Sequence, residues 1–252
     1  GVVIVPLLTL AFGVDIRYAV GASLVSVIAT SSGAAAAYVK EGFSNIRVGM
    51  FLEIATTFGA LFGAFLALHL STPFIAVIFG IVLMHSAYLS GRKIDENPAA
   101  IKPDWFSARL RMDGVYPAEQ GFKAYSVCCV PAGFGIMFIA GIISGLLGIG
   151  SGAVKVLAMD HAMRLPFKVS TATSNFMIGV TAAASAGIYL KKGYIDPGLT
   201  MPVMLGVLLG SSIGARYLFK AKAKKLRIIF SIVIFILALE MIYSGLKAGF
   251  LK

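Results

Sequence analysis

The sequence predicts an all-α polytopic membrane protein with two inverted repeats, each made of a glycine-broken half-helix or re-entrant element and three transmembrane helices. Of its 252 residues, 58% are hydrophobic and 13% are charged, whereas about a quarter of the residues of a soluble domain are charged. Several apolar runs exceed the roughly 18 residues that indicate a membrane-spanning helix, and a barrel strand would need only about 10 alternating residues. The third observation is an internal repeat.

The apolar runs divide the chain into two membrane repeats, residues 1–91 and 124–252, joined by a linker over 92–123. The linker differs from both repeats because it holds three prolines and mixed charges. Each repeat contains an apolar piece that is too short to span a bilayer at about 1.5 Å per residue. In the second repeat, a full-length apolar run and a glycine-rich break precede that piece. The short pieces are predicted at 1–12 and 152–163, and the spans at 19–40, 47–70, 74–90, 125–147, 168–190, 198–219 and 224–246.

A shift of 151 residues superimposes the two repeats without a gap. It aligns glycines, small polar residues and the aromatic, basic, glycine pattern that closes one span of each repeat. Matching breaks over the whole of residues 1–91 make chance agreement a poor explanation, so we interpret the halves as an internal repeat. The aligned pairs include Gly1 with Gly152, Ser23 with Ser174, Thr30 with Thr181, Tyr38 with Tyr189, Gly42 with Gly193, Gly59 with Gly210 and Gly63 with Gly214.

The basic residues give the repeat a direction. Because each repeat has an odd number of spans, the second can be inverted relative to the first. Alternating the loops places 15 Lys and Arg on the linker's side of the membrane and 5 on the other. Positive loops stay in the cytoplasm, so the linker is predicted to be cytoplasmic and the protein to lie in the cell's inner membrane. The same bias explains the formal charge of +11, so no nucleic-acid partner is expected.

The alternation requires residues 125–165 to enter the membrane and return to the same side. A helix, a glycine turn and a half-helix would do that, which is the plan of secondary transporters with broken helices. The first repeat starts at Gly1, already past the equivalent turn. We therefore expect an N-terminal arm to precede Gly1 in the parent protein.

These motifs resemble the sulfite exporter TauE/SafE family. The resemblance lies in the turn Gly148-Ile149-Gly150-Ser151-Gly152, in the element at 19–24 and its counterpart at 170–175, and in the span ends at 38–42 and 189–193. It covers nearly the whole chain except the linker. The chain departs from the family pattern at Ser151, where a glycine is usual, and at Lys155, which replaces a hydrophobic residue. The resemblance implies transport of sulfite, sulfonates such as sulfoacetate, or related small anions.

A binding site for a small anion is expected where the two glycine breaks meet near the bilayer midplane. Broken helices leave backbone N–H groups that lipid cannot satisfy, and a half-helix N-terminus favours negative charge. Close helix packing is the alternative interpretation, since small residues are common at membrane interfaces. The candidate substrate-binding residues are Gly1, Val2, Ser23, Ser151, Gly152, Ala153, Lys155, Thr171, Thr173, Ser174 and Asn175.

Lys155, one of these binding candidates, is a cation within an apolar half-helix, which suggests function, although it could also extend to a membrane surface.

Three further residues, Glu53, Asp160 and His161, are candidates for ion coupling. Glu53 lies within its span and either carries a coupling proton or pairs with Arg47, the interpretation that we favour. Asp160 and His161 form either a proton relay or a structural pair.

Other chemistries find little support in the sequence. The glycine-rich turn lacks the βαβ unit and downstream acid of a nucleotide site, and the three histidines show no metal-ligand spacing. Cys128 and Cys129 are adjacent and read as buried small residues. We expect no enzymatic activity, no cofactor and no metal, and the sequence carries no signal for an oligomeric state. The predicted function is secondary transport, and export, of a small sulfur oxyanion by alternating access, with a passive anion channel as the alternative.

Overall fold

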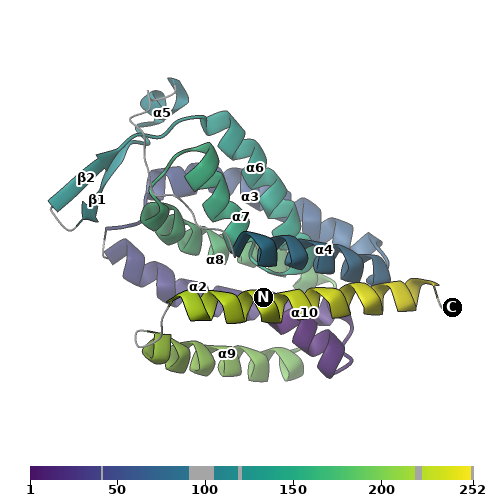
Figure 1. The fold of residues 1–252 in the computed structure, drawn as a ribbon. Coiled ribbons are helices and arrows are strands. Elements are labelled where there is room, and N and C mark those ends of the chain that lie inside the picture. The colour runs from purple at the N-terminus through teal and green to yellow at the C-terminus, as the bar shows by residue number, and fades with distance from the viewer. Residues whose placement is uncertain (41, 91–104, 119–120, 219–222, 251–252) are drawn as a thin grey trace.

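The computed structural model describes residues 1–40, 42–90, 105–118, 121–218 and 223–250, and within them not the side chains of 34–40, 89–90, 118, 121, 153, 212, 214–218, 223–230 and 250. The described part is mostly helical, with one two-stranded hairpin (Figure 1). Its elements are α1 (Ile4–Pro6), η1 (Leu7–Ala11), α2 (Ile16–Lys40), α3 (Ile46–His69), α4 (Thr72–Ser90), α5 (Trp105–Leu110), β1 (Gly114–Ala118), β2 (Gly121–Tyr125), α6 (Val130–Leu147), α7 (Gly152–Leu157), η2 (Ala158–Ala162), α8 (Phe167–Lys191), α9 (Pro197–Leu218) and α10 (Ala223–Phe250).

The element bounds repeat at the same shift of 151 residues that aligns the sequence. The π-helical turns η1 and η2 coincide under this shift, and α2 and α8 coincide at both ends. Helices α3 and α4 begin at the positions equivalent to the starts of α9 and α10. Gly42 and Gly193, which follow α2 and α8, share a φ of 77°. The sequence repeat is therefore matched by a repeat of local structure.

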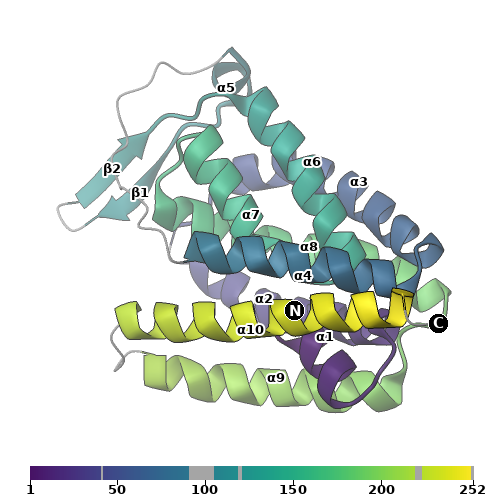
Figure 2. The same ribbon diagram turned by 45° about the vertical axis from the view of Figure 1, so that its right-hand side comes forward.

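Equivalent helices of the two halves pack against each other in opposite directions. Near one end of their crossing, Gly21 of α2 lies against the backbone of Tyr194, and near the other end Ser31 lies against Gly179 of α8. In the second pair, Ser231 of α10 bonds to the carbonyl of Ala87 of α4. These antiparallel pairs, and the contacts of α3 with α8 and of α2 with α9, form the bundle (Figures 1 and 2).

Helices α3 and α6 run parallel and approach each other at four glycines. A Cβ added to Gly59 or Gly63 of α3 would meet the carbonyl oxygen of Phe138 or Ile142, and one added to Gly141 or Gly145 of α6 would meet that of Thr56 or Ala60. Small residues of this kind allow helix backbones to approach closely in membranes. Gly210 of α9, the equivalent of Gly59, has no neighbouring atom within 4 Å of an added Cβ in the described structure.

Length and composition mark three described helical segments as able to cross a membrane, namely Ile46–His69, Val130–Leu147 and Ser231–Gly249. Shorter apolar segments are Thr72–Tyr88 and Pro197–Ser211. Helices α2 and α8 have 25 residues each, but they are rich in Ser, Thr and Ala and are less apolar. The structure therefore supports a multi-pass membrane protein, with helices at all seven predicted spans.

The prediction of a wholly helical chain is wrong in the linker. Strands β1 and β2 pair in antiparallel register there, with Gly114 opposite Tyr125, and α5 precedes them. Valine, tyrosine and phenylalanine favour strands. Pro117 is tolerated in β1 because each strand of a two-stranded ribbon has one unpaired edge. Residues 92–104 and 119–120 of the predicted linker lie outside the described part.

Asn45 attaches the hairpin to the start of α3. Its side-chain oxygen accepts a hydrogen bond from the backbone N–H of Val48 at 3.1 Å, and its Nδ2 donates to the carbonyl of Met112 and to Tyr125 Oη, both at 2.8 Å. Burial raises the pKa of the Tyr125 phenol, so this ring keeps its proton at neutral pH. One side chain thus caps a membrane helix and fixes the linker above it.

Replacing Asn45 by alanine is expected to lower the stability of the folded protein by about 1–2 kcal/mol, because a helix N-cap and its hydrogen bonds are lost. Thermal unfolding in detergent, followed by size-exclusion chromatography, measures the change. Ser44→Ala is the matched control, because the Ser44 hydroxyl has no hydrogen-bond partner among the described residues. Equal melting of the two variants would contradict the capping role.

Candidate functional site

A glycine-rich turn connects α6 to α7 and reverses the direction of the chain. Gly148, Gly150 and Ser151 have φ angles of 67°, 69° and 44°, a left-handed conformation that residues with a side chain adopt at a cost. The backbone N–H of Cys128, just before α6, donates to the carbonyl of Met163, just after η2, at 3.2 Å. The two ends of this segment therefore lie together, as the prediction that residues 125–165 enter and leave the membrane on the same side requires.

The start of the chain meets this turn. A Cβ added to Gly1 would lie 2.5 Å from the Gly148 carbonyl oxygen and 3.0 Å from Ser23 Oγ. Ser23, buried in α2, donates its hydroxyl to the same carbonyl at 2.8 Å. Three predicted features, namely the first glycine break, the second glycine break and Ser23, are thus brought together. Val2 is half-buried and packs against the neighbouring hydrophobic core.

Helix α8 presents one face to the turn and to α7. Ser174, Ile178 and Thr181 share that face because they are spaced by four and three residues. Ser174 Oγ donates to the Gly152 carbonyl at 3.3 Å, and Ile178 fills the space beside Gly150 and Gly152. The hydroxyl of Thr181 lies one turn further along, where the side chain of Lys155 ends.

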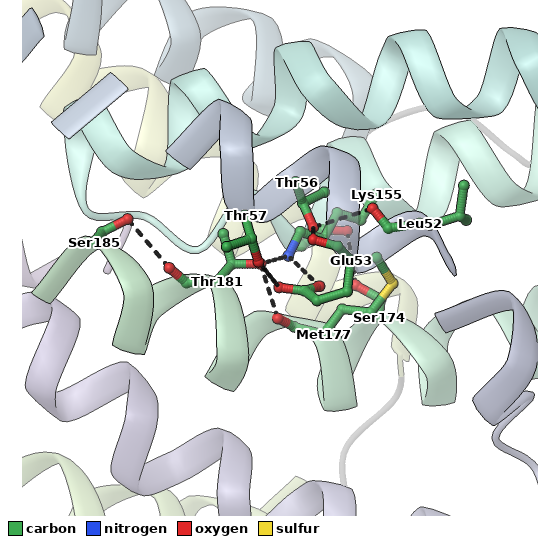
Figure 3. Close-up of polar contacts among 10 residues, drawn as sticks. Leu52, Glu53, Thr56, Thr57, Lys155, Ser174, Met177, Thr181 and Ser185 are labelled. Atoms are coloured by element: carbon green, nitrogen blue, oxygen red, sulfur yellow. Dashed lines mark hydrogen bonds and ion pairs between the residues drawn. The ribbon is translucent and has the colours of Figure 1, made fainter. Parts of the chain in front are cut away.

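Lys155, Thr181 and Glu53 form a buried polar cluster between α7, α8 and α3 (Figure 3). The ammonium of Lys155 donates to Thr181 Oγ1, and Thr181 Oγ1 donates to Glu53 Oε1 at 2.6 Å. Lys155 Nζ lies 3.9 Å from Glu53 Oε2. The side chain of Lys155 has an exposed fraction of 0% and that of Glu53 9%. Lys155 is therefore not a surface anchor.

The favoured interpretation of Glu53 as a partner of Arg47 is wrong. Arg47 instead donates to the carbonyl of Arg111 at 3.1 Å. Residues six apart on a helix project in different directions, since neighbours on one face are three or four apart. The carboxylate of Glu53 points to Lys155 and also accepts from Thr57 at 3.2 Å.

The cluster has unused hydrogen-bonding capacity. An ammonium carries three hydrogens, and Thr181 Oγ1 is its one hydrogen-bond acceptor among the described residues. Glu53 Oε2 is buried with no hydrogen-bond partner in the same part of the chain. Burying a charge is costly unless it is paired and hydrogen-bonded. The Lys155 ammonium therefore has hydrogens without an acceptor, and the Glu53 carboxylate an oxygen without a donor, within the described residues.

The other predicted binding residues do not all gather in one place. Thr173 accepts a hydrogen bond from the backbone N–H of Asn45 at 3.0 Å, at the start of α3 and away from the α7 face. Ser151 and Thr171 have buried hydroxyls without a hydrogen-bond partner in the described structure. Asn175 is half-buried. The side chain of Ala153 lies outside the described part.

Asp160 and His161 lie together in the π-helical turn η2. Their side chains are 4.0 Å apart, with exposed fractions of 16% for Asp160 and 62% for His161. The exposure of His161 fits the interpretation of a structural pair near a surface. Within the described residues, no three His, Cys, Asp or Glu side chains form a group that could hold a metal ion.

Sequence reasoning did not identify Thr181 as a site residue. The shift of 151 residues aligns it with Thr30, whose hydroxyl bonds only to the backbone of its own helix. The usable signal was its spacing of seven residues from Ser174, which places both on one helix face. The equivalents of Lys155 and Glu53 are Ile4 and Met204, so the charged cluster, which joins the two halves, has no symmetry-related copy.

Comparison with known proteins identifies one family for nearly the whole chain. The family model described as "Sulfite exporter TauE/SafE" matches residues 1–241. No solved structure matches the chain.

Curated relatives come from bacteria and an archaeon. The chain is 26% identical over 230 residues to "Probable membrane transporter protein YunE" of Bacillus subtilis, covering 91% of this chain and 82% of that protein. It is 24% identical over 257 residues to "Probable membrane transporter protein MJ0441" of Methanocaldococcus jannaschii, covering 96% and 87%. A "Probable membrane transporter protein" of Xylella fastidiosa is 22% identical over 244 residues, covering 95% and 85%.

Proposed function

The chain belongs to the sulfite exporter TauE/SafE family, and from this premise we propose that it moves a small sulfur oxyanion across the cell's inner membrane by alternating access. The family and the relatives indicate a membrane transporter of the TauE/SafE type. The proposed substrate is sulfite or an organosulfonate such as sulfoacetate, and the proposed direction is export. The lipid bilayer and this anion are the only partners that the proposal requires.

The observation that carries the proposal is the burial of Lys155 behind the glycine turn. An intramembrane cation is costly and by default functional, and Lys155 is fully inaccessible in the described structure. Sulfonate and sulfite oxygens are acceptors for its unused hydrogens. We propose that Ser151, Thr171 and Ser174 add hydroxyl donors and that the amides after the turn, with Gly1 and Ser23 beyond it, complete a site near the midplane.

The architecture supports alternating access. Transporters with inverted repeats bind substrate at broken helices and work by movement of one repeat against the other. Here equivalent helices run antiparallel, and both halves contain a short helix with a π-helical turn. We propose that residues 1–91 and 124–252 are inverted repeats and that the linker 92–123, which carries basic residues, faces the cytoplasm.

Energetics favour export of an anion. An inside-negative potential drives a negative charge outward with about 2.3 kcal/mol per charge per 100 mV. Export along this gradient requires no nucleotide hydrolysis. Movement in the other direction would require a coupling ion.

Uptake into proteoliposomes of the purified protein tests the substrate class. Sulfite, sulfoacetate, thiosulfate, sulfate and acetate are compared at one concentration, with protein-free liposomes as the control for permeation as neutral sulfur dioxide. We expect saturable movement of sulfite or sulfoacetate and little movement of acetate. If acetate moved as fast as every sulfur anion, or if no sulfur anion moved, the substrate assignment would be wrong.

A further inference from the structure

The carboxylate of Glu53 occupies the position beside Lys155 that a substrate anion would need. It is tied to the ammonium through Thr181 Oγ1 and lies 3.9 Å from it directly. Its second oxygen, Oε2, is buried and has no hydrogen-bond partner among the described residues. A carboxylate resembles a sulfonate or sulfite in charge and in acceptor oxygens. Glu53 therefore acts as an internal anion in the empty protein.

A substrate anion at Lys155 would place two negative groups beside one cation. Like charges in a poorly hydrated interior disfavour joint ionisation, and a proton shared between them relieves the repulsion. The other elements packed around Glu53 offer no second cation among the described residues. Helix α6 contains no ionisable side chain, the lysines of α8 lie in its first and last turns and are exposed, and the Tyr189 hydroxyl bonds to the carbonyls of Gly145 and Leu146.

We propose that Glu53 is the proton-coupling residue of this transporter, taking up one proton when the substrate anion replaces it at Lys155. The inference rests on the proposed function, because it concerns the same anion site. On the opposite side of the membrane the anion leaves, Glu53 releases the proton and its carboxylate returns to Lys155. One proton therefore crosses with each anion, and the empty protein reorients with a neutral Lys155–Glu53 pair.

Thr181 is suited to accommodate both states. Its single hydroxyl hydrogen has two acceptors in reach, Glu53 Oε1 at 2.6 Å and the Met177 carbonyl at 2.9 Å. When Glu53 is protonated, the hydroxyl turns to Met177 and its oxygen still accepts from Lys155. Protonation of Glu53 thus leaves the Thr181 hydroxyl with an acceptor in the Met177 carbonyl.

The coupling changes what drives transport. A monovalent anion that moves with a proton carries no net charge, so its direction depends on the anion and proton gradients. A divalent anion such as sulfoacetate, which has a sulfonate and a carboxylate, still carries one negative charge. Export of that dianion therefore remains favoured by an inside-negative potential.

Proton movement with sulfoacetate in proteoliposomes tests the inference. Sulfoacetate is fully ionised at neutral pH, so the ion itself brings no proton. Luminal pH is followed with an enclosed dye while radiolabelled sulfoacetate is counted, and potassium with valinomycin holds the voltage at zero. We expect one proton per sulfoacetate in the wild type, and accumulation of sulfoacetate by the same factor as an imposed inward proton gradient.

The variant Glu53→Gln keeps the shape of the side chain and cannot carry the proton. We expect its sulfoacetate flux to proceed without luminal acidification, to ignore the proton gradient and to depend more steeply on voltage. Glu240→Gln is the matched control, because Glu240 is a carboxylate on α10 whose side chain is exposed on the bundle surface and lies outside the Lys155 cluster, and it should retain wild-type coupling. The stoichiometry of the wild type tests the proton coupling itself even if the Glu53 variant does not fold, because absence of proton movement would overturn the inference.

The outcomes separate this inference from the proposed function. Sulfoacetate movement by the wild type with no proton movement would overturn the coupling role and leave the transport function intact. Continued proton coupling in Glu53→Gln would also overturn it. If the wild type moved neither sulfoacetate nor sulfite, the proposed function would fail and the coupling role with it.

Discussion

Lys155→Ala is expected to abolish saturable uptake of the sulfur oxyanion at micromolar to millimolar substrate. The change removes the one buried cation that the described structure places beside the glycine turn. A hydrogen bond to a charged group contributes about 1.5–3 kcal/mol, which corresponds to roughly 10- to 150-fold weaker binding. Initial rates of uptake against substrate concentration, in proteoliposomes of the variant and the wild type, measure this loss.

Two controls separate a binding defect from misfolding. Lys191→Ala removes an exposed lysine at the end of α8 and should leave uptake unchanged. Lys155→Ala leaves the Glu53 carboxylate buried without its cation, which is destabilising. Removing both side chains in Lys155→Ala/Glu53→Ala should therefore restore yield and melting temperature but not uptake. Wild-type uptake by the double variant would show that this cluster does not bind the anion.

Gly59→Ala is expected to destabilise the bundle by about 1–3 kcal/mol, the range for overpacking at a close contact. The added Cβ would collide with the carbonyl oxygen of Phe138 in α6, which is backbone and cannot move aside as a side chain can. Separation of α3 from α6 would also shift Glu53, which lies on α3 less than two turns away. Thermal unfolding in detergent and the yield of monodisperse protein measure the effect.

The internal repeat supplies the matched control for this prediction. Gly210→Ala makes the same change at the equivalent position of α9, where an added Cβ meets nothing within 4 Å in the described structure. Its stability should match the wild type or exceed it slightly, because alanine favours a helix more than glycine does. Equal destabilisation by the two variants would show that glycine packing between α3 and α6 is not what matters.

Apolar run lengths and glycine positions were enough to predict most of the fold. The hydrophobic spans determined which segments are helical, and the breaks at Gly1 and at 148–152 predicted a turn that the structure places against Ser23. The hairpin was missed because the prolines and charges of the linker concealed the strand-forming residues around Tyr116.

The candidate site was less predictable than the fold, because it depends on the helix face on which each residue lies. Thr173 and Ser174 are adjacent in sequence, yet Thr173 bonds to Asn45 at the start of α3 and Ser174 bonds to Gly152. The pairing of Lys155 with Glu53 joins different halves of the chain at positions where the repeat offers no charged counterpart. Neither spacing nor symmetry could therefore indicate it, and only the packing of α3 beside α7 and α8 brings the two together.

Counterflow of labelled sulfoacetate in proteoliposomes tests the central claim most directly, because it asks whether one site is exposed alternately to the two sides. Vesicles loaded with unlabelled sulfoacetate are diluted into a trace of labelled anion at zero voltage. An alternating-access transporter must accumulate label transiently above the external concentration and then release it, and Lys155→Ala must not. Simple equilibration of the label without an overshoot would instead identify a passive anion channel and contradict the transport mechanism proposed for this chain.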